Sequence, residues 1–374
     1  MIWVFGIITL LYLLLILFLV FGFEKVKEFT TTEINTFHSF SIIIPFRSES
    51  RNLEALFSSL SLLEYPKDAF EIILVNDASE DDSEALCHQF IMRNPDLKVF
   101  LLDSIRASAS PKKDAIMTAI SKSEFPYILT TDADCTVPAK WLQSLSACIA
   151  ETGAELIAGP VVLKKESGLL HSFQELDFLS LQAATIGAFG IEKPIMCNGA
   201  NLCYRKAEFL AVEGFRGNDG IASGDDIFLL GKFVSNHKRT AFLKNPDAIV
   251  TTLAQPDIGS LFSQRIRWAA KTSAYQDPFA KLVGVSVFLM NCILVLELLL
   301  FAFGYDTKQI LLISFLLKFN ADFVLLYRAA SFFGRERSLK TYFWSSLLYP
   351  FFCTSVAIVS LFSGFNWKGR RFRK

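Results

Sequence analysis

The sequence has few cysteines and histidines, and neither is arranged as a site. Its 374 residues include 7 cysteines at scattered positions, with no C-x-x-C pair, and 4 histidines that stand apart. An odd, dispersed set of cysteines argues against a disulfide framework and against a zinc site. We therefore expect reduced thiols, a reducing compartment and no multi-histidine metal centre.

The sequence also lacks an excess of charge of either sign. Lysine and arginine number 37, aspartate and glutamate also 37, and the formal net charge is zero. A chain without net charge has no global field that attracts a polyanion. We therefore expect no nucleic acid among its partners.

Hydrophobic residues are what the sequence has in excess. They make up 52% of the chain, and 37 residues are phenylalanine, which exceeds the content of an ordinary soluble domain. The excess lies in residues 2–23 and after residue 281. The length allows one large globular domain in the middle and membrane segments at both ends.

Residues 2–23 carry no charge and are long enough to cross ~30 Å of hydrocarbon. A cleaved signal peptide is the alternative, but neither a basic N-terminal region nor a small-residue cleavage site precedes Glu24. We expect an uncleaved anchor. Three further apolar segments follow, at Leu282–Phe303, Ile310–Tyr327 and Tyr342–Phe365.

Ionisable residues inside the C-terminal segments are costly in a bilayer, so Lys318 and Asp322 are expected to form a structural pair, and Glu297 to face protein. Basic residues follow the second segment and end the chain, and both groups are typical of the cytoplasmic side. A simple crossing of the last segment would separate them, whereas a re-entrant hairpin at Pro350 would keep both inside. The sequence leaves these alternatives open.

The middle of the chain alternates between short apolar runs and helical patterns. Such alternation predicts a mostly parallel sheet with helices on both faces, and ligands bind such sheets beyond the carboxyl ends of the strands. The predicted strands are Ser41–Ile44, Glu71–Val75, Lys98–Leu102 and Tyr127–Thr131, and the helices between them are Leu53–Leu63, Asp81–Met92 and Lys112–Ser121.

Three of these strands end in polar residues, at Pro45–Glu49, Asn76–Ser79 and Thr131–Asp134. Turn and cap preferences explain one such end well, but three less comfortably. In extended backbone, Asp132 and Asp134 point to the same side. Hard divalent cations bind carboxylates together with phosphate oxygens, and they offset the charge of a departing diphosphate. The pattern predicts a Mg²⁺ or Mn²⁺ site.

Two motifs lie further along the chain. Asp225 and Asp226 open an apolar helix, either as favourable charges at its N-terminus or as the source of a general base. Gln264, Arg267 and Trp268 share one helical face, which offers an amide, a guanidinium suited to phosphate and an aromatic surface for a sugar. An amphipathic helix on the membrane, anchored by Trp268, is the alternative, and both can hold together.

This ordered series resembles the inverting family 2 glycosyltransferases, whose catalytic domain has the GT-A fold. The resemblance spans roughly Ser41 to Trp268. The chain looks like the membrane-anchored bacterial members of that family. It is carried by the Pro45–Glu49 loop, Asp77, Lys112, Asp132 with Asp134, Asn198-Gly199-Ala200-Asn201, Asp225-Asp226, and Gln264, Arg267 and Trp268.

The resemblance also implies a role for each matching residue. Asp226 would be the base that deprotonates the acceptor, Asp134 the principal metal ligand, and Asp132 a contact to nucleotide or metal. The other roles fall into groups: the nucleotide is assigned to Pro45, Glu49, Asp77 and Lys112, the diphosphate and acceptor site to Gln264, Arg267 and Trp268, and the acceptor-side loop to Asn198, Gly199, Ala200 and Asn201.

Two positions depart from the family pattern. Asp225 stands where glutamate is usual, which leaves the role of this first carboxylate open. Asn76 stands where a second acid is common, so the contact to the base rests on Asp77 alone. Neither departure removes the carboxylate assigned as the base.

The predicted organisation is an anchor at 1–23, a GT-A domain at 38–256, an interfacial helix at 257–280, a membrane region at 281–365 and a basic tail at 366–374. The predicted enzyme is a multi-pass cell-membrane glycosyltransferase of the hexosyltransferase type with a cytoplasmic catalytic domain. It would transfer sugar from a nucleotide-diphosphate sugar, first of all a UDP-sugar, to a lipid-linked or membrane-associated acceptor in cell-envelope polysaccharide or glycolipid biosynthesis.

Three other functions remain as alternatives. A processive polysaccharide synthase is the closest, although four short membrane segments are few for a channel. An inactive nucleotide-binding membrane scaffold and a nucleotidyltransferase are the others, and a nucleotidyltransferase gives no reason for the Gln264–Trp268 helix.

Overall fold

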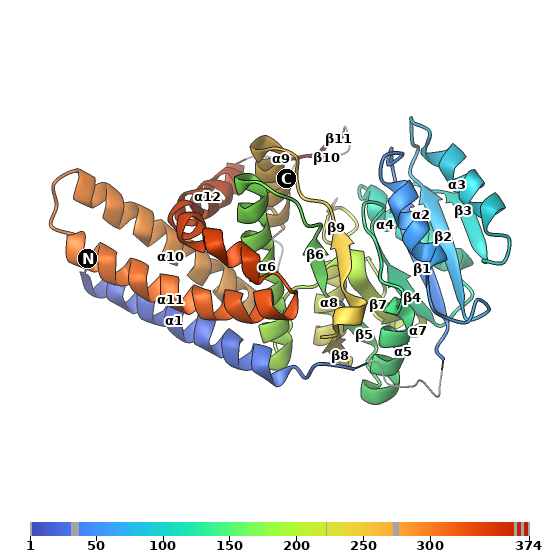
Figure 1. The fold of residues 1–374 in the computed structure, drawn as a ribbon, viewed down its shortest axis with the longest axis horizontal. Helices are drawn as coiled ribbons and strands as arrows, with labels where there is room; N and C mark the ends of the chain where they lie inside the picture. The colour runs from blue at the N-terminus through green and yellow to red at the C-terminus, as the bar shows by residue number, and fades with distance from the viewer. Residues whose placement is uncertain are drawn as a thin grey trace. The chain divides into compact units, whose positions relative to one another are not determined.

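The structure, a computed structural model, describes residues 2–30, 37–221, 223–271, 277–362, 365–367 and 370–372 (Figure 1). The chain forms two compact units, each built from separate stretches of sequence. The sheet unit comprises Lys27–Lys164 and Met196–Leu253, and the helical unit comprises Met1–Val26, Lys165–Ile195 and Ala254–Lys374. The domain boundaries predicted from the sequence are not tested by this division, and they remain predictions.

The sheet unit contains a seven-stranded sheet in the order β3-β2-β1-β4-β7-β5-β8. Strand β7 runs antiparallel to both of its neighbours, and the other pairs are parallel, which confirms the predicted mostly parallel sheet. The strands are β1 Phe40–Phe46, β2 Phe70–Asn76, β3 Val99–Asp103, β4 Tyr127–Thr130, β5 Leu156–Ala158, β7 Leu202–Arg205 and β8 Thr240–Phe242, and β6 Val161–Leu163 pairs with β9 Val250–Thr252 in a second small sheet.

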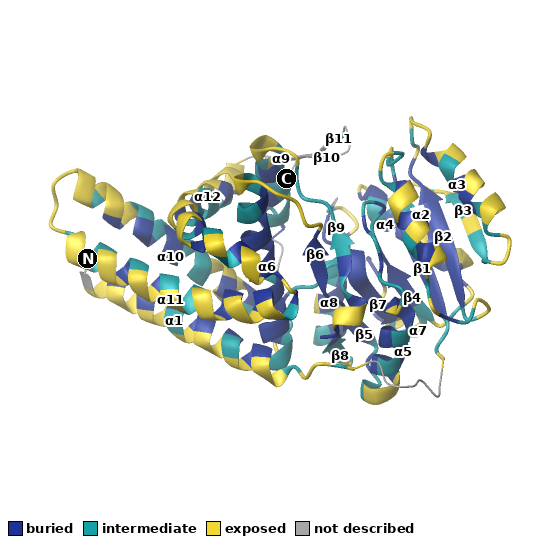
Figure 2. Cartoon of the chain, viewed as in Figure 1, coloured by how far each residue is buried: buried dark blue, intermediate teal, exposed yellow. Residues whose placement is uncertain are grey.

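Strands β1 and β2 are buried along almost their whole length, as Figure 2 shows. Continuous apolar runs such as Phe70–Val75 suit a parallel sheet, because both of its faces are covered. The helices of this unit are α2 Leu53–Ser61, α3 Ser83–Arg93, α4 Pro111–Lys122, α5 Trp141–Thr152, α7 Lys206–Ala211 and α8 Asp225–Ser235.

The strand register brings several chain segments to one edge of the sheet. Phe46 at the end of β1 pairs with Asn76, which pairs in turn with Asp103 at the end of β3. Because β7 is antiparallel, its first residue Leu202 pairs with Thr130 at the end of β4. The turn before β7 therefore lies at the edge where the parallel strands end.

The helical unit consists of α1 Ile2–Lys25, α6 Leu169–Gly190, α9 Ile258–Ala269, α10 Pro278–Ala302, α11 Lys308–Phe332 and α12 Tyr342–Phe362. Within the described residues, four helices are long and apolar enough to cross a membrane: α1, α10, α11 and the segment Glu336–Phe362 that contains α12. The predicted N-terminal and C-terminal membrane helices are confirmed.

Helices α1 and α6 pack with their backbones in direct contact. A Cβ atom added to Gly22 of α1 would lie 2.0 Å from the carbonyl oxygen of Gly187 in α6. A Cβ atom on Gly190 would lie 1.8 Å from the carbonyl oxygen of Gly22. Small residues allow this close approach between helices, and no larger side chain fits at these positions.

The predicted pair of Lys318 and Asp322 is present in α11. The hydroxyl of Tyr12 in α1 donates a hydrogen bond of 2.6 Å to Asp322, so the pair also joins two helices. Helix α12 continues through Pro350 as one helix, rather than the hairpin considered from the sequence. Residues 272–276 of the predicted interfacial helix and Lys368, Gly369, Arg373 and Lys374 of the tail lie outside the described residues.

Candidate active site

Lys112, in the first turn of α4, lies at the centre of the carboxylate cluster. Its ammonium nitrogen is 2.7 Å from Oδ1 of Asp132 and 3.2 Å from Oδ2 of Asp225. Burial alone would lower the pKa of Lys112, but the charges of Asp132 and Asp225 outweigh it and raise that pKa. Lys112 is therefore a permanent cation that joins the end of β4 to the start of α8.

Gly199 brings the turn before β7 into the same cluster. Its backbone N–H donates to Oδ2 of Asp226 at 3.2 Å, and its carbonyl accepts from Thr130 at 2.7 Å. A Cβ atom at Gly199 would lie 3.0 Å from Asp225 Oδ2 and 3.3 Å from Lys112 Nζ. The structure thus brings together four elements predicted from the sequence: Lys112, the end of β4, the Asn198–Asn201 turn and the Asp225-Asp226 pair.

Asp226 itself is held through both carboxylate oxygens. Oδ2 accepts from the N–H of Gly199, and Oδ1 accepts from the N–H of Ile227 at 2.7 Å. A carboxylate accepts hydrogen bonds and protons on both of its oxygens, which is the chemistry that a general base requires.

The Asn198–Asn201 turn divides between the cluster and the core. Asn198 accepts a hydrogen bond from Ala200 N at 3.0 Å and so holds its own turn. Asn201 is fully buried. Its amide donates to two backbone carbonyls at 2.9 Å and accepts from Trp141 Nε1 at 2.9 Å. The Asn201 side chain therefore has a structural role.

Asp134 follows Asp132 in the turn after β4, where Cys135 N donates to the Asp132 carbonyl at 3.1 Å. No group of three or more histidine, cysteine, aspartate or glutamate residues within the described ranges could hold a metal. Mg²⁺ is commonly held by one or two carboxylates, water and the phosphates of a substrate. Asp132 and Asp134 supply two carboxylates of this chemical type, and their assignment as metal ligands stays a prediction.

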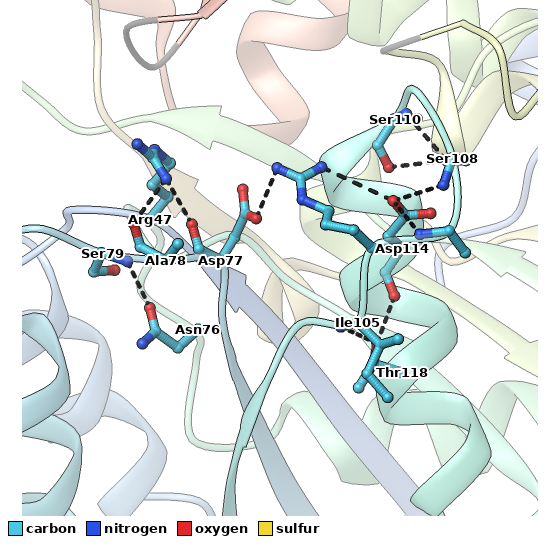
Figure 3. Close-up of polar contacts among 12 residues, drawn as sticks. Arg47, Asn76, Asp77, Ala78, Ser79, Ile105, Ser108, Ser110, Asp114 and Thr118 are labelled. Atoms are coloured by element: carbon cyan, nitrogen blue, oxygen red, sulfur yellow. Dashed lines mark hydrogen bonds and ion pairs between the residues drawn. The ribbon is translucent and has the colours of Figure 1, made fainter.

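Asp77 follows β2 and is nearly buried beside two arginines (Figure 3). Arg106 Nη2 lies 3.0 Å from Asp77 Oδ1. Arg47 donates to the carbonyls of Asp77 and Ala78, at 2.9 Å and 2.7 Å. Arg106 was not predicted from the sequence, where its one signal is a position three residues after the end of β3, at the same edge of the sheet.

The loops after β1 and β2 are tied into one surface. Ser48 N donates to the hydroxyl of Ser79 at 3.0 Å, and Glu49 N donates to the hydroxyl of Ser83 at 2.8 Å. Ser48 and Ala78 have positive φ angles of 51° and 55°. Residues other than glycine rarely adopt such backbone angles, and the residues that do so concentrate at functional sites.

Two other predicted nucleotide contacts lie in or after β1. Pro45 is in β1 opposite Val75. The Glu49 carboxylate accepts from Asn52 Nδ2 at 2.6 Å and is partly exposed. Both residues lie at the sheet edge that carries Asp77.

Gln264, Arg267 and Trp268 lie on α9 in the helical unit. Their neighbour Arg265 is buried, and its guanidinium donates to the side chain of Gln264 and lies 4.3 Å from the centre of a Trp268 ring. Arg265 lies between the motif residues and was not predicted to be functional.

Comparison with known proteins gives a family and a fold. The family model described as Glycosyl transferase family 21 matches residues 1–373. Glycosyltransferase AglE of Haloferax volcanii is 26% identical over 128 residues, which are 34% of this chain and 41% of that protein. Poly-beta-1,6-N-acetyl-D-glucosamine synthase of Staphylococcus epidermidis is 26% identical over 235 residues, covering 61% of this chain and 53% of that protein. The chain thus spans about half the length of these relatives.

The fold also resembles that of a solved structure along almost its whole length. Mannosyltransferase PcManGT from Pyrobaculum calidifontis, in complex with GDP-Man and Mn²⁺, superposes with a TM-score of 0.59 at 18% identity, covering 96% of each chain. The resemblance to GT-A glycosyltransferases and the α/β fold class are confirmed, with family 21 as the matching family.

Proposed function

Because the chain belongs to Glycosyl transferase family 21, we propose that it transfers a sugar from a nucleotide-diphosphate sugar to a lipid-linked or membrane-associated acceptor. The prediction of an enzyme, a glycosyltransferase of the hexosyltransferase type, is confirmed. The observation that carries the proposal is the cluster of Lys112, Asp132, Asp225 and Asp226 at the edge where the parallel strands end. Ligands bind α/β sheets at this edge.

The proposed reaction is a single displacement with inversion at the anomeric carbon. Asp226 accepts the proton of the acceptor hydroxyl while that oxygen attacks the anomeric carbon. The new glycosidic bond forms as the bond to the diphosphate oxygen breaks, and the nucleoside diphosphate leaves with the bonding electrons. Arg267 is proposed as the guanidinium that binds the departing diphosphate.

The donor would lie along the ends of β1 to β4. Asp77, with Arg106, would bind the base, while Pro45 and Glu49 line the same edge. Asp134 and Asp132 would hold Mg²⁺ or Mn²⁺, which when bound supplies positive charge against the leaving diphosphate. The Lys112 ammonium lies between the carboxylates of Asp225 and Asp132, where it offsets their mutual repulsion and holds both in position.

The substitution Asp226→Asn tests the base. Positioned general-base catalysis contributes on the order of 10²–10⁴-fold, so turnover should fall within that range while the affinity for donor stays unchanged. Release of nucleoside diphosphate and calorimetric donor binding measure the two quantities. Asp219→Asn, which changes an exposed acid in the preceding loop, is the control. Near-normal turnover of Asp226→Asn would refute the assignment.

The membrane helices favour an acceptor in or at the bilayer. A processive polysaccharide synthase is the second candidate, and the likeness to a poly-N-acetylglucosamine synthase supports it. Membranes that contain the enzyme, supplied with a panel of nucleotide-sugars and lipid extract, distinguish the two. One added sugar supports transfer to a lipid, a ladder of products supports the synthase, and donor binding without nucleotide release supports an inactive scaffold.

The sheet unit is proposed to face the cytoplasm, where nucleotide-sugars are made. The supporting observation is the set of basic residues in the last turns of α11 and in the connection that follows it, which positive-inside statistics assign to that side: Arg328, Arg335, Arg337 and Lys340. Protease protection of sealed, right-side-out vesicles tests it. Digestion of the sheet unit from outside would contradict this orientation.

A further inference from the structure

Asp177 and Arg265 form a buried ion pair that the proposed reaction does not use. Nε of Arg265 on α9 lies 2.6 Å from Oδ2 of Asp177 on α6, and both side chains are more than nine-tenths buried. A buried charge is stable only when it is paired and hydrogen-bonded. Asp177 therefore determines where the Arg265 guanidinium lies.

Arg265 in turn contacts two residues of the Gln264–Trp268 motif. Its Nη1 donates to the Gln264 side-chain oxygen, and its guanidinium carbon lies 4.3 Å from the centre of a Trp268 ring. Phe178, next to Asp177 on α6, packs against Trp268 with ring centres 6.4 Å apart. Helix α6 thus supports the motif through a charge and through an aromatic ring.

We propose that Asp177 is a positioning residue for the transfer reaction: through Arg265 it fixes the rotamers of Gln264 and Trp268 on α9. The inference rests on the proposed function of that motif at the diphosphate and the acceptor. A guanidinium held at one end by a carboxylate presents its remaining N–H groups and its flat face in fixed directions. Reacting groups must be held within a fraction of an ångström, and a displacement of ~1 Å can cost about 10²-fold in rate.

A second buried pair on the same helix provides a matched control. Glu175 of α6 lies 2.9 Å from Nε of Arg335, and its other oxygen accepts from Ser338. The side chains of Glu175 and Arg335 are buried to a degree similar to those of Asp177 and Arg265. The two partners of Glu175, however, belong to the connection between α11 and α12. Loss of this pair should loosen the fold without touching the motif.

The test compares Asp177→Asn with Glu175→Gln in the full-length enzyme. Each substitution removes one buried charge from α6 and keeps the shape of the side chain. We expect both to lower the melting temperature, whereas only Asp177→Asn lowers kcat, by about 10²-fold at unchanged donor KM. In a background where the other tryptophans are phenylalanine, Asp177→Asn should also change the emission of Trp268.

Asp177→Glu and Arg265→Lys decide the question if Asp177→Asn fails to fold. The glutamate keeps the ion pair but moves the guanidinium, so kcat should fall partially. The lysine keeps a charge for Asp177 but loses the flat face over Trp268, so it should lower kcat as well.

Normal kcat in Asp177→Asn, or in both fallback variants, overturns the inference. An equal fall of kcat in Glu175→Gln also overturns it, because the effect then comes from general loosening of the unit. These results are distinct from failure of the proposed function, in which the unsubstituted enzyme itself releases no nucleoside diphosphate from any nucleotide-sugar.

Discussion

The guanidinium of Arg106 lies 3.0 Å from the carboxylate of Asp77, at the end of β2. Side by side, the two groups present an acceptor and a donor. Each nucleobase carries an N–H group beside an acceptor atom on its edge, so this arrangement can bind a base without selecting one. We propose that Asp77 and Arg106 together contact the base of the nucleotide-sugar.

We predict that Arg106→Ala weakens the binding of UDP or GDP about tenfold or more, since a hydrogen bond to a charged group contributes ~1.5–3 kcal/mol. Titration calorimetry with UDP, GDP, CDP and ADP measures the effect. Arg93→Ala, at an exposed position of α3, is the control. Unchanged affinity for all four nucleotides would exclude Arg106 from the donor site.

Asp134→Ala should abolish the dependence of donor binding on metal. With Mn²⁺ present, the variant should bind nucleotide-sugar only as well as the unsubstituted enzyme does in a chelator, because the carboxylate proposed to hold the cation is gone. Asp68→Ala, which changes an exposed acid, should behave as the unsubstituted enzyme. The metal assignment fails if chelator leaves the affinity of the unsubstituted enzyme as it was.

Gly199→Ala should lower turnover with little loss of stability. The added Cβ would meet Asp225 Oδ2 at 3.0 Å and Lys112 Nζ at 3.3 Å, so the cluster has to shift by a few tenths of an ångström. Gly220→Ala meets nothing within 4 Å and is the matched control. Rates of nucleotide release and melting temperatures separate the two effects, and equal rates for both variants would contradict the prediction.

The pair of Lys318 and Asp322 should stabilise the helical unit only as a pair. Removal of one partner leaves an uncompensated buried charge, which costs ~3–5 kcal/mol, whereas apolar replacement of both is close to neutral. We expect Lys318→Met to lower the melting temperature in detergent more than the double change Lys318→Met and Asp322→Leu. A double variant that is less stable than both single variants would show that the ions are required for another reason.

The sequence predicts the parallel half of the sheet well. Runs such as Ser41–Ile44 and Glu71–Val75 are continuous and apolar because both faces of a parallel strand are covered, and the strands extend only slightly beyond the predicted bounds. The antiparallel strand β7 was not predicted. Its four residues contain no feature that fixes the strand direction, which depends on pairing with the distant strand β4.

Within the candidate site, the sequence predicted the residues that belong to motifs, but it did not predict the residues that contact and position them. Lys112 and Asp132 belong to a known series, although their contact joins parts of the chain that only the fold brings together. Arg106 and Asp177 form part of no motif. Arg106 is distinguished by its ion pair with Asp77, and Asp177 by its buried ion pair with Arg265, and a single sequence shows neither contact.

The close approach of α1 and α6 makes the N-terminal helix part of the folded protein. Gly22 meets the backbone of Gly187 and Gly190 without intervening side chains, and α6 also carries Asp177, the partner of Arg265. Deleting the first 26 residues to obtain a soluble enzyme would thus remove the helix that packs against α6, and α6 in turn carries the partner of Arg265 on α9. A foreign anchor of equal length would keep the protein on the membrane. Gly187 and Gly190 of α6 would then lack the close backbone contact that α1 provides.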